Sequence, residues 1–347
     1  AHKFPAELAV TKIIDIEIQV GRTGSLSPVA RLKPVNIGGV IVSNVTLHNK
    51  DYISGKDSRG ENIRGGVDIR VDDWVEVYRA GDVIPKVKSV ILRRRHKNSN
   101  KFIFPTCCPI CGSITSKEQE DSTIRCTGGM LCSAQAIEKI KHFVSKKAFN
   151  IDGFGRKIVE NFFLSGWVKK PSDIFCLEKK YGPGCLLKIE DMDGWGSQSA
   201  SKLFEAINDR RKITLSRFIF ALGIRHVGEQ AAHLLAKYFT SWENFHSHTS
   251  ISPEKHSKEW LDLVLIDGIG ETTALSLIDY FASDEAKWVV SDLLQEVQVE
   301  NFSSNISIES LFYDLTIVFS GSLNKMTRAE AKSPSEALGA KVSSSIS

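Results

Sequence analysis

The stretch "CCPICGSITSKEQEDSTIRCTGGMLC" spans residues 107–132 and holds five of the seven cysteines of this chain. A disulfide framework would spread its cysteines through a small secreted domain, whereas cysteines crowded into one short segment are typical of a metal site. The segments before this stretch have the patterns of strands, and those after it have the patterns of helices. The cysteine stretch therefore marks the change from an all-β part to an all-α part.

The gaps between the cysteines indicate which of them bind. Two residues separate Cys108 from Cys111, so both sulfurs can face one ion, and Cys126 and Cys132 supply a second pair. Adjacent cysteines do not readily enter one tetrahedron, although Cys107 paired with Cys111 is a less common alternative. Four thiolate ligands fill a tetrahedral metal site and leave no coordination position open for water. This predicts one structural Zn²⁺ held by Cys108, Cys111, Cys126 and Cys132.

The segment before the cysteines has the pattern of a small antiparallel barrel. "IIDIEIQVG" (13–21) alternates as a half-buried strand does, and further strands are expected within residues 38–47 and 73–92. The face predicted to be buried consists of Ile14, Ile16, Ile18 and Val20. The polar, glycine-rich residues 54–66 are predicted to form an exposed loop insertion.

Four glycine-containing turns recur in the helical part. "NIDGFGRKI" (150–158), "DMDGWGSQS" (191–199) and "LIDGIGETT" (265–273) share Asp-Gly-hydrophobic-Gly, and "LGIRHVGEQAA" (222–232) has His226 in place of the first glycine. The corresponding positions are Gly153, Gly194, His226 and Gly268, separated by 41, 32 and 42 residues. This long-short-long order predicts a duplicated unit of two turns.

The turns resemble the helix-hairpin-helix motif. A tight glycine turn directs backbone N–H groups outward at a helix N-terminus, which suits a phosphate and is blind to base sequence. Simple helix connections with glycine caps are the alternative, above all for the His226 copy. The candidate DNA-binding glycines are Gly153, Gly155, Gly194, Gly196, Gly228, Gly268 and Gly270.

Composition limits the class of protein. With 347 residues, 42% hydrophobic and 25% charged, the chain is expected to form several globular modules, and no apolar run approaches membrane-spanning length. The net charge of +4 does not by itself indicate nucleic-acid binding. The run 92–101 holds five Lys and Arg residues and no acid, which is typical of a solvated linker or of a contact with backbone phosphates.

Several local matches carry a resemblance to the bacterial NAD-dependent DNA ligases. "HKFPAE" (2–7) is similar to their last nucleotidyltransferase motif, and the cysteine stretch matches their zinc ligands. Their OB-fold segments are similar to "QVGRTGSLSPVARLKPV" (19–35), "TLHNKD" (46–51) and "RAGDVIP" (79–85). The resemblance implies a multidomain protein in five parts: the end of a nucleotidyltransferase domain (1–4), an all-β OB barrel (5–95), a four-cysteine zinc finger (96–133), an all-α helix-hairpin-helix domain (134–300) and a partial α/β BRCT domain (308–347).

The resemblance also implies an activity. The family seals nicks in duplex DNA through lysyl-adenylate and DNA-adenylate intermediates, using NAD⁺ and Mg²⁺. Lys3 would contact the adenylate phosphate without being the nucleophile, and Arg22 and Arg79 would contact the DNA backbone or, alternatively, play a structural role. The nucleophile's Lys-x-Asp-Gly motif is absent, so the chain is expected to be a fragment that binds DNA but does not adenylate itself.

The resemblance also leads to expectations for the location, the oligomeric state and the C-terminal part of the protein. The resemblance implies a cytoplasmic, nucleoid-associated monomer that binds nicked DNA irrespective of sequence. Pro334 would interrupt the first BRCT helix, so this part is not expected to fold alone. A non-enzymatic helix-hairpin-helix module for DNA repair or scaffolding is the alternative function, while a zinc-ribbon RNA binder would leave the four turns unexplained.

Overall fold

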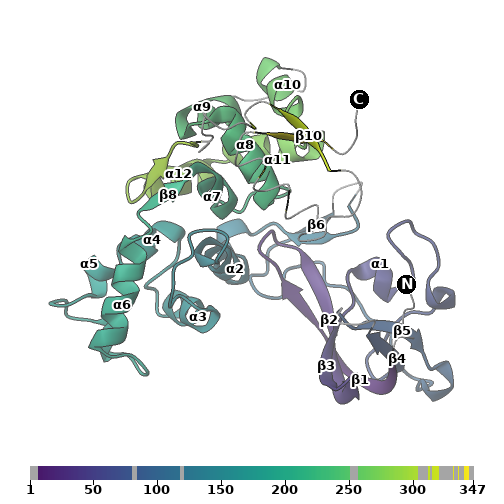
Figure 1. Cartoon of the computed structure of the whole chain (residues 1–347). Coiled ribbons are helices and arrows are strands. Elements are labelled where there is room, and N and C mark those ends of the chain that lie inside the picture. The colour runs from purple at the N-terminus through teal and green to yellow at the C-terminus, as the bar shows by residue number, and fades with distance from the viewer. Residues whose placement is uncertain are drawn as a thin grey trace. The chain divides into compact units, whose positions relative to one another are not determined.

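The computed structural model describes residues 7–79, 84–117, 121–250 and 257–303, together with the positions 312, 315–319, 331, 335 and 340–343. It divides into two compact units, of which the first comprises Ala1–Val144 with Asp152–Leu203 and the second comprises Ser145–Ile151 with Phe204–Ser347 (Figure 1). The division falls inside residues 134–300, the predicted helical domain, and the domain boundaries expected from the sequence stay a prediction.

The first unit begins with a five-stranded antiparallel sheet in the order β3-β2-β1-β4-β5. Its strands are β1 (Glu7–Val20), β2 (Leu26–Ile37), β3 (Val40–Thr46), β4 (Trp74–Arg79) and β5 (Lys86–Val90). The first half of β1 pairs with β4 and its second half with β2, so this strand belongs to both sides of the sheet. The edge strands β3 and β5 also contact each other, which gives the curled, barrel-like form that was predicted.

The predicted buried face of β1 is wrong at one position. The pairing of β1 with β2 shifts between Ile13 and Asp15, where a β-bulge or similar irregularity breaks the alternation. Ile13 is therefore fully buried, whereas Ile14 is 56% exposed. Beyond the shift the expected pattern resumes, with Ile16 and Val20 buried in the core.

Strand β2 was not identified from the alternation pattern, because prolines interrupt it. Pro28 pairs opposite Ile18, and Pro34 falls where the pairing of β2 with β3 shifts between Arg31 and Val35. A proline lacks the N–H that a central strand donates, so a sequence with two prolines argues against an inner strand. The register shift places Pro34 outside the regular pairing with β3.

The cysteine segment does not have a separate core. Phe104, Cys108, Cys126 and Cys132 are buried in the same hydrophobic cluster as the inner residues of the barrel, such as Ile13. Two short strands, β6 (Thr115–Lys117) and β7 (Ile124–Cys126), pair antiparallel in this segment, and η3 (Gly129–Leu131) follows them. The barrel and the cysteine segment therefore share one continuous core.

Helices complete the first unit. A short helix, α1 (Lys50–Ile53), and the 3-10 turns η1 (Arg64–Gly66) and η2 (Leu92–Arg94) lie within the barrel region. The later helices are α2 (Ser133–Val144), α3 (Arg156–Leu164), α4 (Pro171–Phe175), α5 (Leu177–Tyr181), η4 (Ile189–Asp191) and α6 (Ser197–Asn208), the last of which runs on into the second unit. Phe143 of α2 meets Phe175 of α4 edge to face, with the ring centroids 6.3 Å apart.

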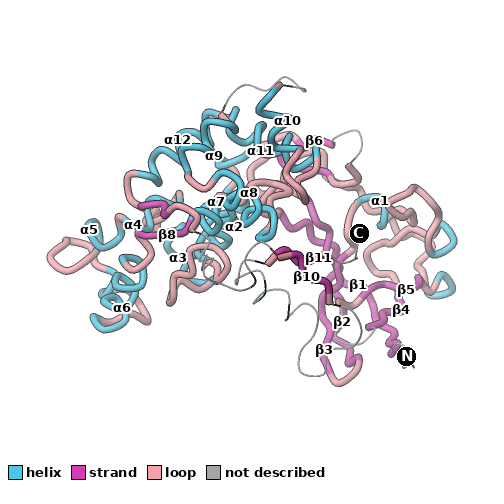
Figure 2. Tube along the Cα trace, turned by 45° about the horizontal axis from the view of Figure 1, so that its top comes forward, coloured by secondary structure: helices cyan, strands magenta, loops and turns pink. Residues whose placement is uncertain are grey.

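The second unit is mainly helical, as Figure 2 shows. Its elements are β8 (Lys212–Thr214), α7 (Leu215–Ala221), α8 (Glu229–Phe239), α9 (Trp242–Thr249), α10 (Lys258–Val264), α11 (Glu271–Ala282), α12 (Asp284–Leu294) and β9 (Gln298–Glu300). Strands β8 and β9 pair parallel. Residues 145–151 belong here because Arg217 donates to the Ala148 carbonyl at 2.8 Å and Arg210 donates to the Asn150 carbonyl at 3.1 Å.

The described residues of the last segment form a parallel pair, β10 (Thr316–Val318) with β11 (Lys341–Ser343). The strand expected at β10 exists, but it was expected to be buried, and Thr316 is exposed while Ile317 and Val318 are half-buried. Pro334 and most of the predicted BRCT helix lie outside the described residues.

Candidate metal centre and helix turns

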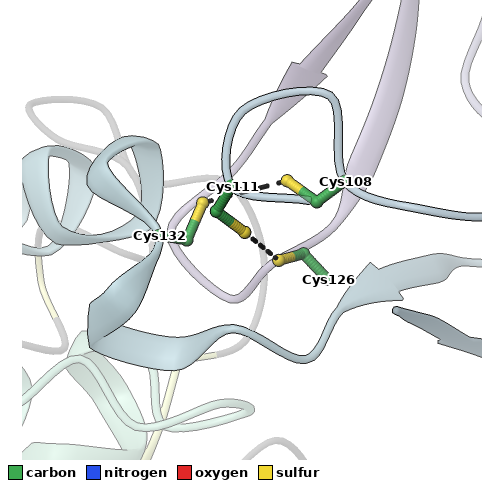
Figure 3. A group of neighbouring side chains, drawn as sticks. All are labelled: Cys108, Cys111, Cys126 and Cys132. Atoms are coloured by element: carbon green, nitrogen blue, oxygen red, sulfur yellow. Dashed lines mark hydrogen bonds between the residues drawn. The ribbon is translucent and has the colours of Figure 1, made fainter. Parts of the chain in front are cut away.

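Four cysteine sulfurs converge in the first unit. The Sγ atoms of Cys108, Cys111, Cys126 and Cys132 all lie within 4.8 Å of one another (Figure 3). The Cys108–Cys132 and Cys111–Cys126 Sγ separations are 3.9 and 3.5 Å. Tetrahedral Zn–S bonds of about 2.3 Å require sulfurs about 3.8 Å apart, so the cluster fits such an ion closely. Cys107 is exposed and lies outside the cluster.

The surroundings of the sulfurs favour a bound cation. Burial raises the pKa of Cys126 to about 12 and also raises the pKa of Cys132. Hydrogen bonding with Ser113 lowers the pKa of Cys111 to about 6. A thiolate next to buried neutral thiols gains stability from a divalent cation, which also lowers the pKa values of the remaining thiols. The centre can therefore hold a metal ion.

Glycines that the sequence reasoning missed allow this geometry. The Gly128 N–H group donates to Cys126 Sγ at 3.3 Å. A Cβ atom at Gly128 would lie 2.7 Å from Ser113 Oγ and 2.9 Å from Cys111 Sγ, so only glycine fits without a local shift. No local pattern marks Gly128, because the crowding arises only when the two cysteine pairs meet.

The metal centre is attached directly to the barrel. The Cys126 N–H group donates to the Gly24 carbonyl at 2.8 Å, and Arg125 donates to Thr23 Oγ1 at 3.0 Å. Gly24, between β1 and β2, has a φ of 78°, and an added Cβ would lie 2.6 Å from the Cys126 carbonyl oxygen. The turn between β1 and β2 therefore holds one side of the cysteine cluster.

The four predicted turns share one backbone geometry. The residue before the central hydrophobic one has a positive φ in each copy: Gly153 (79°), Gly194 (79°), His226 (62°) and Gly268 (88°). In three copies a carbonyl accepts from the N–H group three residues later, as between Ile266 and Ile269 at 2.9 Å. A positive φ at the third position of such a turn is the type II geometry, which favours glycine. His226 adopts it as well, so the altered residue keeps the turn.

Each turn ends in a glycine immediately before a helix. The carbonyls of these glycines accept the N–H group four residues later, at 2.9–3.1 Å, which makes the four helix starts equivalent. The donors are Val159, Ala200, Ala232 and Ala274, bonded to Gly155, Gly196, Gly228 and Gly270. Among the glycines that the structure describes, these four alone have neither a positive φ nor any atom within 4 Å of an added Cβ.

The turns are supported in pairs within each unit. In the first unit the central residues Phe154 and Trp195 both contact Phe162 of α3, with ring centroids 5.6 and 5.8 Å apart. In the second unit an added Cβ at Gly268 would lie 2.8 Å from Leu234 of α8, the helix that follows the His226 turn. The copy at Gly194 departs from the motif, because only the short η4, and not an α-helix, immediately precedes it.

Arg22, Arg79 and Lys3 are the remaining predicted site residues. Arg22, after β1, is half-buried, and burial lowers the pKa of its guanidinium. Arg79 ends β4 opposite Glu7. Both arginines have interaction partners within the chain, which suits their alternative, structural role. Lys3 lies outside the described residues. Among the described helices, none has the length and apolar character needed to cross a lipid bilayer.

A curled five-stranded barrel, a four-cysteine centre and repeated helix-hairpin-helix turns define a multidomain protein with the architecture expected from the sequence. The OB-fold domain of NAD-dependent DNA ligases matches residues 10–99, and the helix-hairpin-helix motif matches residues 217–290. Together with the relatives described next, these matches show that the chain is similar, along its whole length, to part of an NAD-dependent DNA ligase.

The chain is similar along its whole length to DNA ligases of several bacteria. The DNA ligase of Roseobacter denitrificans is 50% identical over 347 residues, and that of Cereibacter sphaeroides (strain ATCC 17029) is 52% identical over 347 residues. The DNA ligase of Paracoccus denitrificans is 47% identical over 391 residues. The chain covers 49%, 49% and 51% of these proteins, and so spans about half the length of its relatives.

Proposed function

We propose that this chain is the DNA-holding part of an NAD⁺-dependent DNA ligase that seals nicks in duplex DNA. Each step of that reaction is an in-line phosphoryl transfer, in which positioning of the reacting groups and stabilisation of charge dominate. The barrel and the turns would hold the duplex backbone around the nick. NAD⁺ and Mg²⁺ would serve the adenylation chemistry of the whole protein, which we propose to be a cytoplasmic, nucleoid-associated monomer.

The glycines that end the turns carry this proposal. Nothing within the described chain requires glycine at Gly155, Gly196, Gly228 or Gly270, since their φ angles suit any residue and a Cβ would meet open space. Four positions kept clear at the starts of four helices are suited to a ligand that approaches the backbone closely. A phosphate at a helix N-terminus is such a ligand, and repeated sites suit a polymer of phosphates.

The four turns are not equivalent in the chemistry around them. Helix α3 begins with Arg156 and Lys157, whereas α8 and α11 begin with Glu229 and Glu271. At the Gly194 copy the Gly196 N–H group already donates to Ser199 Oγ at 2.9 Å, so a phosphate would have to displace that hydroxyl. The turn before α3 is therefore the strongest candidate for phosphate binding.

Changing Gly155 and Gly270 together to valine is expected to weaken DNA binding while the fold persists. If the unmodified chain contacts about four to six phosphates, the logarithm of its association constant for DNA should fall against the logarithm of the salt concentration, with a slope near −4 to −5. The double variant should lose about 1.8 from the magnitude of that slope, equally for all duplex sequences. Titration of labelled nicked duplexes at several salt concentrations measures both values.

Gly166→Val is the matched control, because Gly166 is also a glycine with open space around it but follows α3 instead of preceding a helix. Its substitution carries backbone strain, since its φ is 79°, yet it should leave the salt slope unchanged. An unchanged slope in the Gly155/Gly270 variant, or a changed preference for base sequence, would count against backbone binding by the turns.

We also propose that the metal is zinc and that Lys3 contacts the adenylate phosphate. A lysine there would balance the negative charge that develops on the transferring group. In the full-length protein, Lys3→Ala is expected to slow nick sealing by about a hundredfold. Affinity for nicked DNA and metal content should stay unchanged, and Lys3→Arg should restore activity only in part. Sealing at the parent rate would return Lys3 to an ordinary surface role.

A further inference from the structure

A groove lies beside the barrel, where the basic run 92–101 passes the start of β4. Its volume is about 780 Å³, and its walls include Lys12, Asp72, Trp74, Arg94, His96 and Lys101. The guanidinium of Arg94 lies over the Trp74 ring, 4.9 Å from the ring centroid. The groove thus joins an aromatic face to several cations, and neither the turns nor the metal centre contributes to it.

The charge in this groove is not balanced within the described chain. Arg94 and Lys101 are exposed and make no ion pair with any described residue. The acid in the wall, Asp72, is paired with Lys12 at 2.6 Å. Arg93 and Lys97, in the same run, are exposed as well. Like charges held together without counter-charges repel one another, so an anionic ligand would stabilise this arrangement.

The run is fixed in place, which distinguishes it from a solvated linker. Arg95 is bidentate to Asp73, at 2.8 and 2.7 Å, and also donates to Asp68 at 2.7 Å. Arg70 donates to the Ser99 carbonyl at 2.6 Å, further along the same run. The side chain of Asp73 is only 1% exposed, so this anchor is buried. The backbone that carries Arg94 and Lys101 is therefore held on the barrel.

We propose that this groove binds the sugar–phosphate backbone of a DNA strand, as a contact separate from the glycine turns. The inference rests on the proposed function, because it names a second place where the duplex is held. Cations on a fixed segment are suited to phosphates spaced along a strand, and they carry no information about base sequence. An aromatic ring beside them can contact the apolar face of a sugar or a base.

The variant Arg94→Gln/Lys101→Gln in this 347-residue chain tests the groove. Each lost phosphate contact should lower the magnitude of the salt slope by about 1, so the pair should lower it by about 2 on nicked duplexes of any sequence. The control is Lys33→Gln/Lys56→Gln, which removes the same charge from two exposed barrel lysines away from the groove. The control should leave the slope unchanged.

An equal loss in both double variants would overturn the inference, because it would show a general effect of charge instead of a site. A loss seen only with a single-stranded oligonucleotide of the same length would overturn it as well. If the parent chain binds duplex DNA and the groove variant keeps the parent's salt slope, the proposal for the groove is wrong while the proposed function stands. If the parent chain does not bind duplex DNA, the proposal for the groove and the proposed function are both wrong.

Discussion

Replacing Cys126 with serine is expected to remove the metal ion and to loosen the barrel together with the cysteine segment. Its Sγ atom belongs to the cluster whose members all lie within 4.8 Å, and its side chain is buried in the core that the barrel shares. Structural zinc contributes roughly 10 kcal/mol or more of folding free energy in small metal modules, so losing one ligand should cost several kcal/mol here. Elemental analysis should fall from one zinc per chain to nearly none.

Cys107→Ser is the matched control for this experiment. Cys107 is adjacent to a cluster member in sequence, yet it is exposed and its sulfur lies outside the cluster. Its variant should keep one zinc per chain and the parent's resistance to urea. Loss of the metal from the Cys107 variant, with retention by the Cys126 variant, would overturn the ligand set.

Replacing Asp73 with alanine is expected to destabilise the barrel by about 3 kcal/mol, because it removes the buried carboxylate that accepts from Arg95 and from the Arg70 N–H group, although Arg95 keeps its ion pair with Asp68. Asp73 is 1% exposed and accepts from Arg95 Nε and Nη2 and from the Arg70 N–H group at 2.8 Å. Removing the carboxylate would take the acceptor from Arg95 Nε and from the Arg70 N–H group, while Arg95 Nη1 and Nη2 keep Asp68 as theirs. Hydrogen exchange of the β1 and β4 amides measures the loss within this unit.

The neighbouring residue supplies a control whose carboxylate is exposed. Asp72 is 60% exposed, and its ion pair with Lys12 at 2.6 Å lies on the surface. A surface pair contributes less than about 1 kcal/mol, so Asp72→Asn, which removes the charge and keeps a residue suited to the φ of 70° at this position, should leave the exchange of the same amides almost unchanged. Equal effects of the two substitutions would show that the Arg95–Asp73 anchor does not stabilise the barrel.

Local spacing was enough to predict the parts of this protein whose geometry is set over a few residues. Two residues between Cys108 and Cys111 bring their sulfurs to one point, and the recurring glycine pattern marks the four turns before any contact is known. The alternating strand at 13–21 was visible for the same reason. Each of these features depends on backbone geometry within a single short segment.

The tertiary structure decided what depends on distant segments. Burial of Ile13 in place of Ile14 follows from the pairing of β1 with β2, and Arg125 meets Thr23 across 102 residues of sequence. The anchoring of Arg95 by Asp73, the crowding at Gly128 and the open space at Gly155 likewise appear only when the segments are assembled. Local sequence patterns cannot predict these features, because each depends on neighbouring residues that only the tertiary packing brings together.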